Sequence, residues 1–167
     1  MEERTYEQIA LIGAGVIGSG WATRCLAKGL SVVLTDPSPD ARSQVKKTIE
    51  GAWPVLEDSG LISQGDPTNF RFVETIQEAV EGADFIQENV PEREDLKIEV
   101  HETIDRYAAE DVVIASSSSG LLPSRLQDQC QHPDRILIGH PFAPVYLLPL
   151  VEIVGGEKTS TEVVRRA

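Results

Sequence analysis

Residues 8–36 combine the residue types and spacing of a dinucleotide-binding site. Gly13, Gly15 and Gly18 follow the apolar segment 8–12. The first glycine permits a tight turn after a strand, the second lets a pyrophosphate approach the backbone, and the third lets a helix pack closely on the strand. The N–H groups at the start of that helix would hold the phosphates. The sequence therefore predicts that the loop Gly13-Ala14-Gly15-Val16-Ile17-Gly18 binds a dinucleotide.

Asp36 indicates which dinucleotide this would be. It follows the second apolar segment, 31–35, and is placed to accept hydrogen bonds from the adenosine ribose. A carboxylate there would repel the extra phosphate of NADP, so NAD is the expected cofactor. A glycine-rich turn without a ligand is the simpler alternative. The cofactor site is favoured because strand, helix, second strand and terminal acid all lie within one βαβ length.

Further polar residues lie at the ends of the later predicted strands or within the last one. In a doubly wound sheet the carboxyl ends of the strands meet ligands, so these side chains are candidates for chemistry. Each also has a simpler interpretation. A histidine after a strand can be an ordinary loop residue, a serine run can cap a helix, an acid at a helix start is favoured by the helix dipole, and an acid within a strand can face solvent. The candidates are Glu92, Ser116, Ser119, His140 and Glu152.

Apolar segments alternate with stretches of helical periodicity along the chain. This alternation predicts an α/β fold with a doubly wound, mostly parallel sheet of the Rossmann type, with a helical insertion after the second strand. The expected strands cover residues 8–12, 31–35, 71–73, 84–87, 111–115, 136–138 and 150–154. The expected helices cover residues 16–28, 39–51, 53–58, 76–81 and 95–108, with shorter ones from 123 and from 159.

The composition argues against several classes of protein. The chain has 167 residues, which suits one domain, and a net charge of −12, which argues against nucleic acid and anionic membranes as partners. No segment is long and apolar enough to span a bilayer, and the charged residues 1–4 do not begin a signal peptide. The two cysteines, Cys25 and Cys130, form no disulfide framework, so a cytoplasmic location is expected. No cluster has the spacing of metal ligands.

Five motifs occur in an order and at a spacing that resemble one enzyme family. The chain is similar to the NAD-binding domain of the L-3-hydroxyacyl-CoA dehydrogenase family. Within that family, segments 86–88, 119–123 and 146–152 look most similar to the L-carnitine dehydrogenase branch, and the L-gulonate 3-dehydrogenase branch is also similar. The motifs are the glycine loop 13–18, QENVPE at 87–92, the four serines at 116–119, HPF at 140–142 with Pro144, and LVE at 150–152.

The resemblance implies a role for each candidate. His140 would be the general base that takes a hydroxyl proton, for which a side chain that titrates near neutrality is suited, and Glu152 would hold its ring. Ser119 would hydrogen-bond the substrate oxygen. Glu92, at the nicotinamide end, and Ser116 would contact the cofactor. The implied reaction is transfer of a hydride from the 3-hydroxyl carbon of a small L-3-hydroxy acid to NAD.

The resemblance also implies a C-terminal helical domain that completes the substrate site and forms a homodimer. The chain stops at Ala167, inside a predicted helix that has no terminal cap. We therefore expect residues 1–167 to be the dinucleotide-binding domain of a longer protein. A frayed natural terminus is the alternative.

The charge of segment 49–66 bears on the substrate. The phosphates of a CoA ester call for Lys or Arg, and this segment contains neither. Its acidic residues would tolerate a cation, so L-carnitine is the expected substrate. L-3-hydroxyacyl-CoA, such as 3-hydroxybutyryl-CoA, and L-gulonate remain alternatives, because acids on a surface often serve only to keep it solvated. The acidic residues are Glu50, Glu57, Asp58 and Asp66.

Ala143 departs from the family pattern. The family usually has an asparagine between the aromatic residue and the proline that follow the histidine, whereas this chain has alanine. Because alanine offers no side-chain hydrogen bond, either another group supplies that contact or turnover is impaired. A catalytically silent NAD-binding or structural protein is therefore a further alternative.

Overall fold

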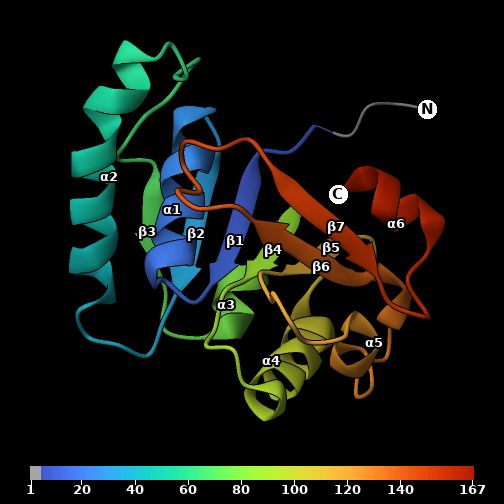
Figure 1. Cartoon of the computed structure of the whole chain (residues 1–167). Coiled ribbons are helices and arrows are strands. Elements are labelled where there is room, and N and C mark those ends of the chain that lie inside the picture. Colours follow the sequence, from blue (N-terminus) through green and yellow to red (C-terminus); the bar gives the residue numbers. More distant parts are fainter. Residues whose placement is uncertain (1–4) are drawn as a thin grey trace.

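The computed structural model describes residues 5–167, and within them seven strands form one sheet in the order β3-β2-β1-β4-β5-β6-β7 (Figure 1). Strands β1 to β6 are parallel and β7 is antiparallel to β6. The strand order reverses between β1 and β4, which is where doubly wound sheets bind ligands. The strands are β1 (Gln8–Ile12), β2 (Ser31–Thr35), β3 (Phe70–Phe72), β4 (Phe85–Glu88), β5 (Val113–Ser116), β6 (Ile136–Pro141) and β7 (Val151–Gly155).

Helices cover both faces of the sheet, because alternate side chains of each strand point to opposite sides. Ile9 and Leu11 pack in the core beneath α1 and α2, whereas Ala10 and Ile12 pack in the core beneath α3 and α4. This arrangement confirms the predicted α/β fold and mostly parallel sheet. The helices are α1 (Val16–Ala27), α2 (Ala41–Asp58), α3 (Ile76–Val80), α4 (Glu94–Tyr107), α5 (Pro123–Leu126) and α6 (Thr161–Arg166), with a 3₁₀ turn at Pro133–Arg135.

The helical segment after β2 is one helix, so the prediction of two pieces, 39–51 and 53–58, was wrong. Helix α2 continues through Pro54, which lies inside it. Its buried residues keep helical spacing on both sides of this proline, and α2 packs against α1. Burial of one continuous apolar stripe therefore outweighs the hydrogen bond that a proline removes from a helix. The buried residues are Ala41, Val45, Ile49, Ala52 and Leu56.

Helix α4 buries charged as well as apolar side chains. Lys97 and His101 are almost fully buried on the same helix as Val100, whereas Tyr107 at its end is 44% exposed. The other strands and helices begin and end within two residues of their predicted bounds, except that β6 continues three residues past its predicted end at Ile138. No helix within residues 5–167 is both long enough and apolar enough to cross a membrane. Residues 1–4, whose charge argued against a signal peptide, lie outside the described part of the chain.

Asp105 and Arg135 form a buried ion pair that joins the end of α4 to the start of β6. The Asp105 carboxylate accepts hydrogen bonds from Arg135 Nε at 3.1 Å and Nη2 at 2.8 Å, and also from the backbone N–H of Gln131 and His132. Burial raises the pKa of Asp105, but these hydrogen bonds and the positive charge of Arg135 outweigh it, so the pKa lies below its usual value.

Asp105→Ala should lower the free energy of unfolding by about 3 kcal/mol at pH 7, because it leaves the Arg135 charge buried without its partner. The pair stabilises the fold above about pH 4, the pKa of an unfolded aspartate, and this contribution is lost as the pH falls through the lower folded value. In urea unfolding, the free energies of unfolding of the wild type and of Asp105→Ala should therefore become equal as the pH is lowered. Glu102→Ala, which breaks the exposed pair with Arg106, is the control and should cost about 0.5 kcal/mol or less.

Candidate active site

Two adjoining cavities lie along the carboxyl ends of β1, β4, β5 and β6. The larger, about 520 Å³, reaches the end of β2, and the smaller, about 360 Å³, reaches the end of β6. Gly15 and residues 89–91 belong to the walls of both, so the two cavities form one continuous hollow. The hollow crosses the point at which the strand order reverses, where the polar residues singled out in the sequence were expected to meet.

The glycine loop has the shape of a phosphate cradle. Gly13 has a φ of 95°, and a Cβ there would lie 2.8 Å from the Asn89 carbonyl. A Cβ on Gly18 would collide with the Gly13 carbonyl oxygen, whereas a Cβ on Gly15 would meet only open space. Helix α1 begins at Val16, and its N-cap residue, Gly15, provides no side-chain cap, which leaves N–H groups for an anion. The loop therefore fits the diphosphate of a dinucleotide.

Asp36 lies at the end of β2, in the wall of the larger cavity. Its Oδ2 accepts a hydrogen bond from the Ala14 N–H at 2.7 Å, and its Oδ1 accepts one from the Ser38 N–H at 2.8 Å. The carboxylate is thus fixed beside the glycine loop, and its remaining lone pairs can accept the hydroxyls of a ribose. The Ala14 N–H, in contrast, already donates to Asp36 and is not available to a phosphate.

His140 and Glu152 lie directly opposite each other on the antiparallel strands β6 and β7. His140 Nδ1 and Glu152 Oε2 are 2.9 Å apart, and the histidine belongs to the wall of the smaller cavity. Because the carboxylate occupies Nδ1, Nε2 is the nitrogen left to exchange a proton with a substrate. The two residues that the sequence resemblance paired are therefore brought together, in the arrangement of a histidine and a carboxylate that orients its ring.

Glu92 holds the loop that carries Ser119. Its Oε1 accepts hydrogen bonds from Ser118 Oγ at 2.5 Å, the Ser119 N–H at 3.0 Å and the Gly120 N–H at 3.2 Å. Burial raises the pKa of Glu92, but these hydrogen bonds and the nearby Lys97 ammonium outweigh it and lower the pKa below its usual value. Glu92 and Ser119 both belong to the wall of the smaller cavity.

Ser116 lies beneath the cavity rather than in its wall. Strand β5 includes Ser116, and its hydroxyl donates a hydrogen bond to Glu88 Oε2 at 2.5 Å while the residue is fully buried. The next residue, Ser117, belongs to the wall of the smaller cavity. Successive residues of a strand face opposite sides of the sheet. Ser116 therefore points beneath the cavity, and Ser117 is the serine that faces it.

Lys97 is a cavity residue that the sequence reasoning missed. Its ammonium lies 2.7 Å from Glu88 Oε1 and 3.6 Å from Glu92 Oε2, and it belongs to the wall of the smaller cavity. Burial lowers the pKa of His101, which is therefore neutral at pH 7 beside this pair. The available signal was the spacing of Lys97 and His101, which puts both on the buried side of α4 with Val100.

The glycine loop and the histidine–carboxylate pair can be compared with known proteins. The family described as 3-hydroxyacyl-CoA dehydrogenase, NAD binding domain, matches residues 8–167. The chain belongs to this family. Membership confirms the resemblance noted in the sequence and confirms NAD as the cofactor.

Several curated relatives of this family member are named L-carnitine dehydrogenase. The protein from Burkholderia mallei is 52% identical over 96% of this chain and 50% of its own length. The protein from Pseudomonas aeruginosa is 53% identical over 95% of this chain and 49% of its own length. The chain therefore spans about half the length of the curated relatives it matches.

Solved structures share the fold of this 3-hydroxyacyl-CoA dehydrogenase domain. The NAD⁺-dependent dismutase 5-formyl-3-hydroxy-2-methylpyridine 4-carboxylic acid 5-dehydrogenase has a TM-score of 0.87 and 37% identity, covering 96% of this chain and 52% of its own. The 3-hydroxybutyryl-CoA dehydrogenase of Escherichia coli K12 has a TM-score of 0.88 and 23% identity, covering 98% of this chain and 35% of its own. These structures confirm the expected Rossmann-type fold.

Asp36→Ala should weaken NAD by about tenfold and change NADP less, because it removes both a ribose acceptor and the charge that repels a 2′-phosphate. Calorimetric titration of this chain with each dinucleotide measures the two affinities. Asp36→Asn is the matched control, since it retains an oxygen for one backbone N–H but loses the charge. An unchanged preference for NAD in both variants would show that Asp36 does not face the ribose.

Proposed function

We propose that this chain is the cofactor-binding half of an NAD-dependent dehydrogenase that oxidises small L-3-hydroxy acids, with L-carnitine as the substrate. One observation carries the proposal: His140, which Glu152 holds through its Nδ1, lies in the wall of the same hollow that begins at the glycine loop. Oxidation of an alcohol requires a base for the proton of the hydroxyl and a hydride acceptor for the hydrogen on the carbon that bears it.

The chain's own residues would divide the work as follows. His140 takes the hydroxyl proton on Nε2, and Glu152 stabilises the imidazolium that results. Ser119 holds the oxygen that becomes the carbonyl, on a loop fixed by Glu92. The Lys97 ammonium, paired with Glu88 and 3.6 Å from Glu92, helps to hold the Glu92 carboxylate at the cavity wall. When bound, NAD would accept the hydride from the carbon that bears the hydroxyl. That carbon would then become the carbonyl carbon of a ketone.

Glu92 and Ser116 would act on the cofactor in different ways. Glu92 is in the cavity wall, where its second oxygen can meet the nicotinamide end. Ser116 would act from beneath, because its buried hydroxyl bonds Glu88, which in turn fixes the Lys97 ammonium. Direct contact between Ser116 and NAD would require this hydroxyl to turn away from Glu88.

Two observations favour L-carnitine among the L-3-hydroxy acids. The curated relatives, which are about 50% identical to this chain, carry that name. The charge of segment 49–66 does not bear on the choice, because the loop after α2 packs on the end of α1, where the Ser63 N–H bonds the Ala27 carbonyl, away from both cavities. The Phe142 ring, 38% exposed, lies 5.7 Å from the His140 ring. In carnitine the quaternary nitrogen is two bonds from the hydroxyl carbon, so a cation held at His140 comes within reach of an aromatic face.

The CoA-ester alternative also has one observation in its favour. A surface hollow of about 730 Å³ along α2 includes Arg42, Lys46 and Trp53 in its walls. The Arg42 guanidinium, however, stacks 5.2 Å from the Phe72 ring, and Lys46 lies 3.8 Å from Glu50. Both positive charges therefore already have partners, which favours the smaller substrate.

We further propose that the rest of the protein provides a C-terminal helical domain, which completes the substrate pocket and forms a homodimer. The length of the relatives supports this, because the chain matches about half of each.

We also propose a cytoplasmic location. Cys25 and Cys130 form no disulfide, and burial raises the pKa of each thiol to about 12, so both are inert thiols of the kind that a reducing compartment keeps.

The full-length protein should reduce NAD with L-carnitine and show little activity with L-gulonate or 3-hydroxybutyryl-CoA. The formation of NADH, followed by its absorbance, measures the rates. Activity with the CoA ester alone would contradict the carnitine assignment, and binding of NAD without turnover of any of the three would support the silent protein that Ala143 allows.

Phe142→Leu should raise the KM for L-carnitine several-fold, because it removes the aromatic face next to the base.

His140→Ala should abolish turnover in the full-length protein, because no other group of the described site is placed to take the hydroxyl proton. The affinity for NAD should stay within several-fold, since the diphosphate and ribose contacts lie at the other end of the hollow. Steady-state rates and calorimetry on the same preparation give the two values. Loss of NAD binding would mean that His140 serves the cofactor site and not the chemistry.

A further inference from the structure

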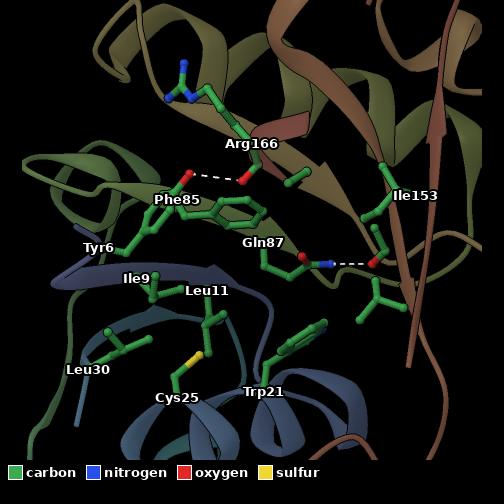
Figure 2. Close-up of a pocket in the computed structure, with 13 residues that line it drawn as sticks. Tyr6, Ile9, Leu11, Trp21, Cys25, Leu30, Phe85, Gln87, Ile153 and Arg166 are labelled. Atoms are coloured by element: carbon green, nitrogen blue, oxygen red, sulfur yellow. Dashed lines mark hydrogen bonds between the residues drawn. The ribbon is translucent and has the colours of Figure 1, made fainter. Parts of the chain in front are cut away.

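Gln87 is a buried polar residue that the proposed reaction does not use. It lies on β4, is 3% exposed, and faces the side of the sheet that carries α1. Its Nε2 donates hydrogen bonds to Ser117 Oγ at 2.7 Å and to the Gly139 carbonyl at 2.9 Å. Figure 2 shows the amide pointing across a pocket toward the backbone of β6.

The bond to Gly139 holds the part of β6 that bears the base. Strand β5 ends at Ser116, which pairs with Ile138, so the last residues of β6 have β7 on one side and no strand on the other. The Gly139 carbonyl belongs to the peptide unit that contains the His140 nitrogen, and that unit is planar. The Gln87 amide therefore takes the place of the missing strand at the position next to His140.

The same amide connects His140 to the cofactor loop. Ser117 Oγ donates a hydrogen bond to Asn89 Oδ1 at 2.6 Å, and the Asn89 N–H donates one to the Ile12 carbonyl at 2.7 Å, where β1 ends. Asn89 is also the residue against which Gly13 closes. A continuous line of contacts thus runs from the glycine loop through Ser117 and Gln87 to the tip of β6.

The surroundings of Gln87 hold its amide in place. A Cβ on Gly139 would lie 3.1 Å from the Ala115 Cβ and 3.4 Å from Gln87 Oε1, so glycine leaves just enough room for the amide. The adjoining pocket, about 260 Å³, has Leu11, Trp21 and Phe85 in its walls (Figure 2). Hydrogen bonds are stronger and harder to replace in such apolar surroundings than in water.

We propose that Gln87 is a positioning residue for hydride transfer: by tying the Gly139 carbonyl to Ser117, it fixes the distance between His140 and the bound cofactor. The inference rests on the proposed dehydrogenase function. Transfer between two bound groups is sensitive to their separation, and displacements of about 1 Å are enough to lower a rate by about a hundredfold.

Gln87→Met tests this role, because methionine fills a similar volume but cannot donate a hydrogen bond. In the full-length protein kcat should fall by about tenfold or more, while the dissociation constant for NAD stays within about threefold. The primary isotope effect on kcat, measured with substrate deuterated at the hydroxyl carbon, should rise because hydride transfer becomes slower relative to product release. A merely structural role would leave the isotope effect unchanged.

Gln127→Met is the matched control. Gln127 is also a buried amide, 1% exposed, and its Nε2 donates hydrogen bonds to the Ile136 and Pro133 carbonyls at the opposite end of β6. This variant should lower the melting temperature without changing kcat or the isotope effect. Equal losses of kcat in both variants, or an unchanged kcat in Gln87→Met, would overturn the proposal.

Hydrogen exchange of this chain separates the proposal from the function on which it rests. Amides in peptides covering 138–142 should exchange at least several-fold faster in Gln87→Met than in wild type, and at an unchanged rate in Gln127→Met. Unchanged exchange in Gln87→Met would overturn the tether whatever the activity. If the wild-type full-length protein oxidises no 3-hydroxy acid, the function fails and the catalytic role falls with it, whereas faster exchange still supports the tether.

Discussion

The close approach of the glycine loop to the backbone of Asn89 is the constraint on which the site depends. Gly13 adopts a φ of 95°, and its missing Cβ would lie 2.8 Å from the Asn89 carbonyl. Three helices, α1 to α3, and three strands, β2 to β4, lie between these loops along the chain, and the loops meet because β1 and β4 pair in parallel, with Ile12 opposite Glu88. Any larger residue at position 13 would separate the two loops and widen the hollow between them.

The hollow holds one buried positive charge in an otherwise acidic molecule. The chain carries a net charge of −12, yet the wall of the smaller cavity contains the Lys97 ammonium and the uncapped start of α1. Lys97 keeps its place because Glu88 pairs with it, and the other hydrogen bonds of that carboxylate come from Ser116 and the Val90 N–H. A buried pair satisfied on all sides is stable, whereas removal of one partner leaves an uncompensated charge. The Lys97 ammonium is thus held in the cavity wall between Glu88 and Glu92.

The parts of the fold that sequence could predict are those set by local rules. The β1–α1–β2 unit is one, since its glycines and Asp36 act within a single crossover. Pro54 misled the prediction of α2 because a local rule gave way to an apolar stripe that continued past it. The sequence analysis missed Lys97 because its partner, Glu88, lies on another element. The end of β5 is set by pairing with neighbouring strands, and this places Ser116 beneath the cavity and Ser117 in its wall.

The pairing of His140 with Glu152 could not be derived from their spacing alone, because it depends on the register of an antiparallel pair. A slip of one residue would turn Glu152 to the other face of the sheet. With the register set, the two constraints on His140 differ in kind. The Glu152 side chain is 58% exposed and can follow the imidazole ring, so it orients the ring but does not fix its distance from the cofactor. That distance is instead governed by the backbone of β6, which β7 holds on one side and the buried amide of Gln87 holds on the other.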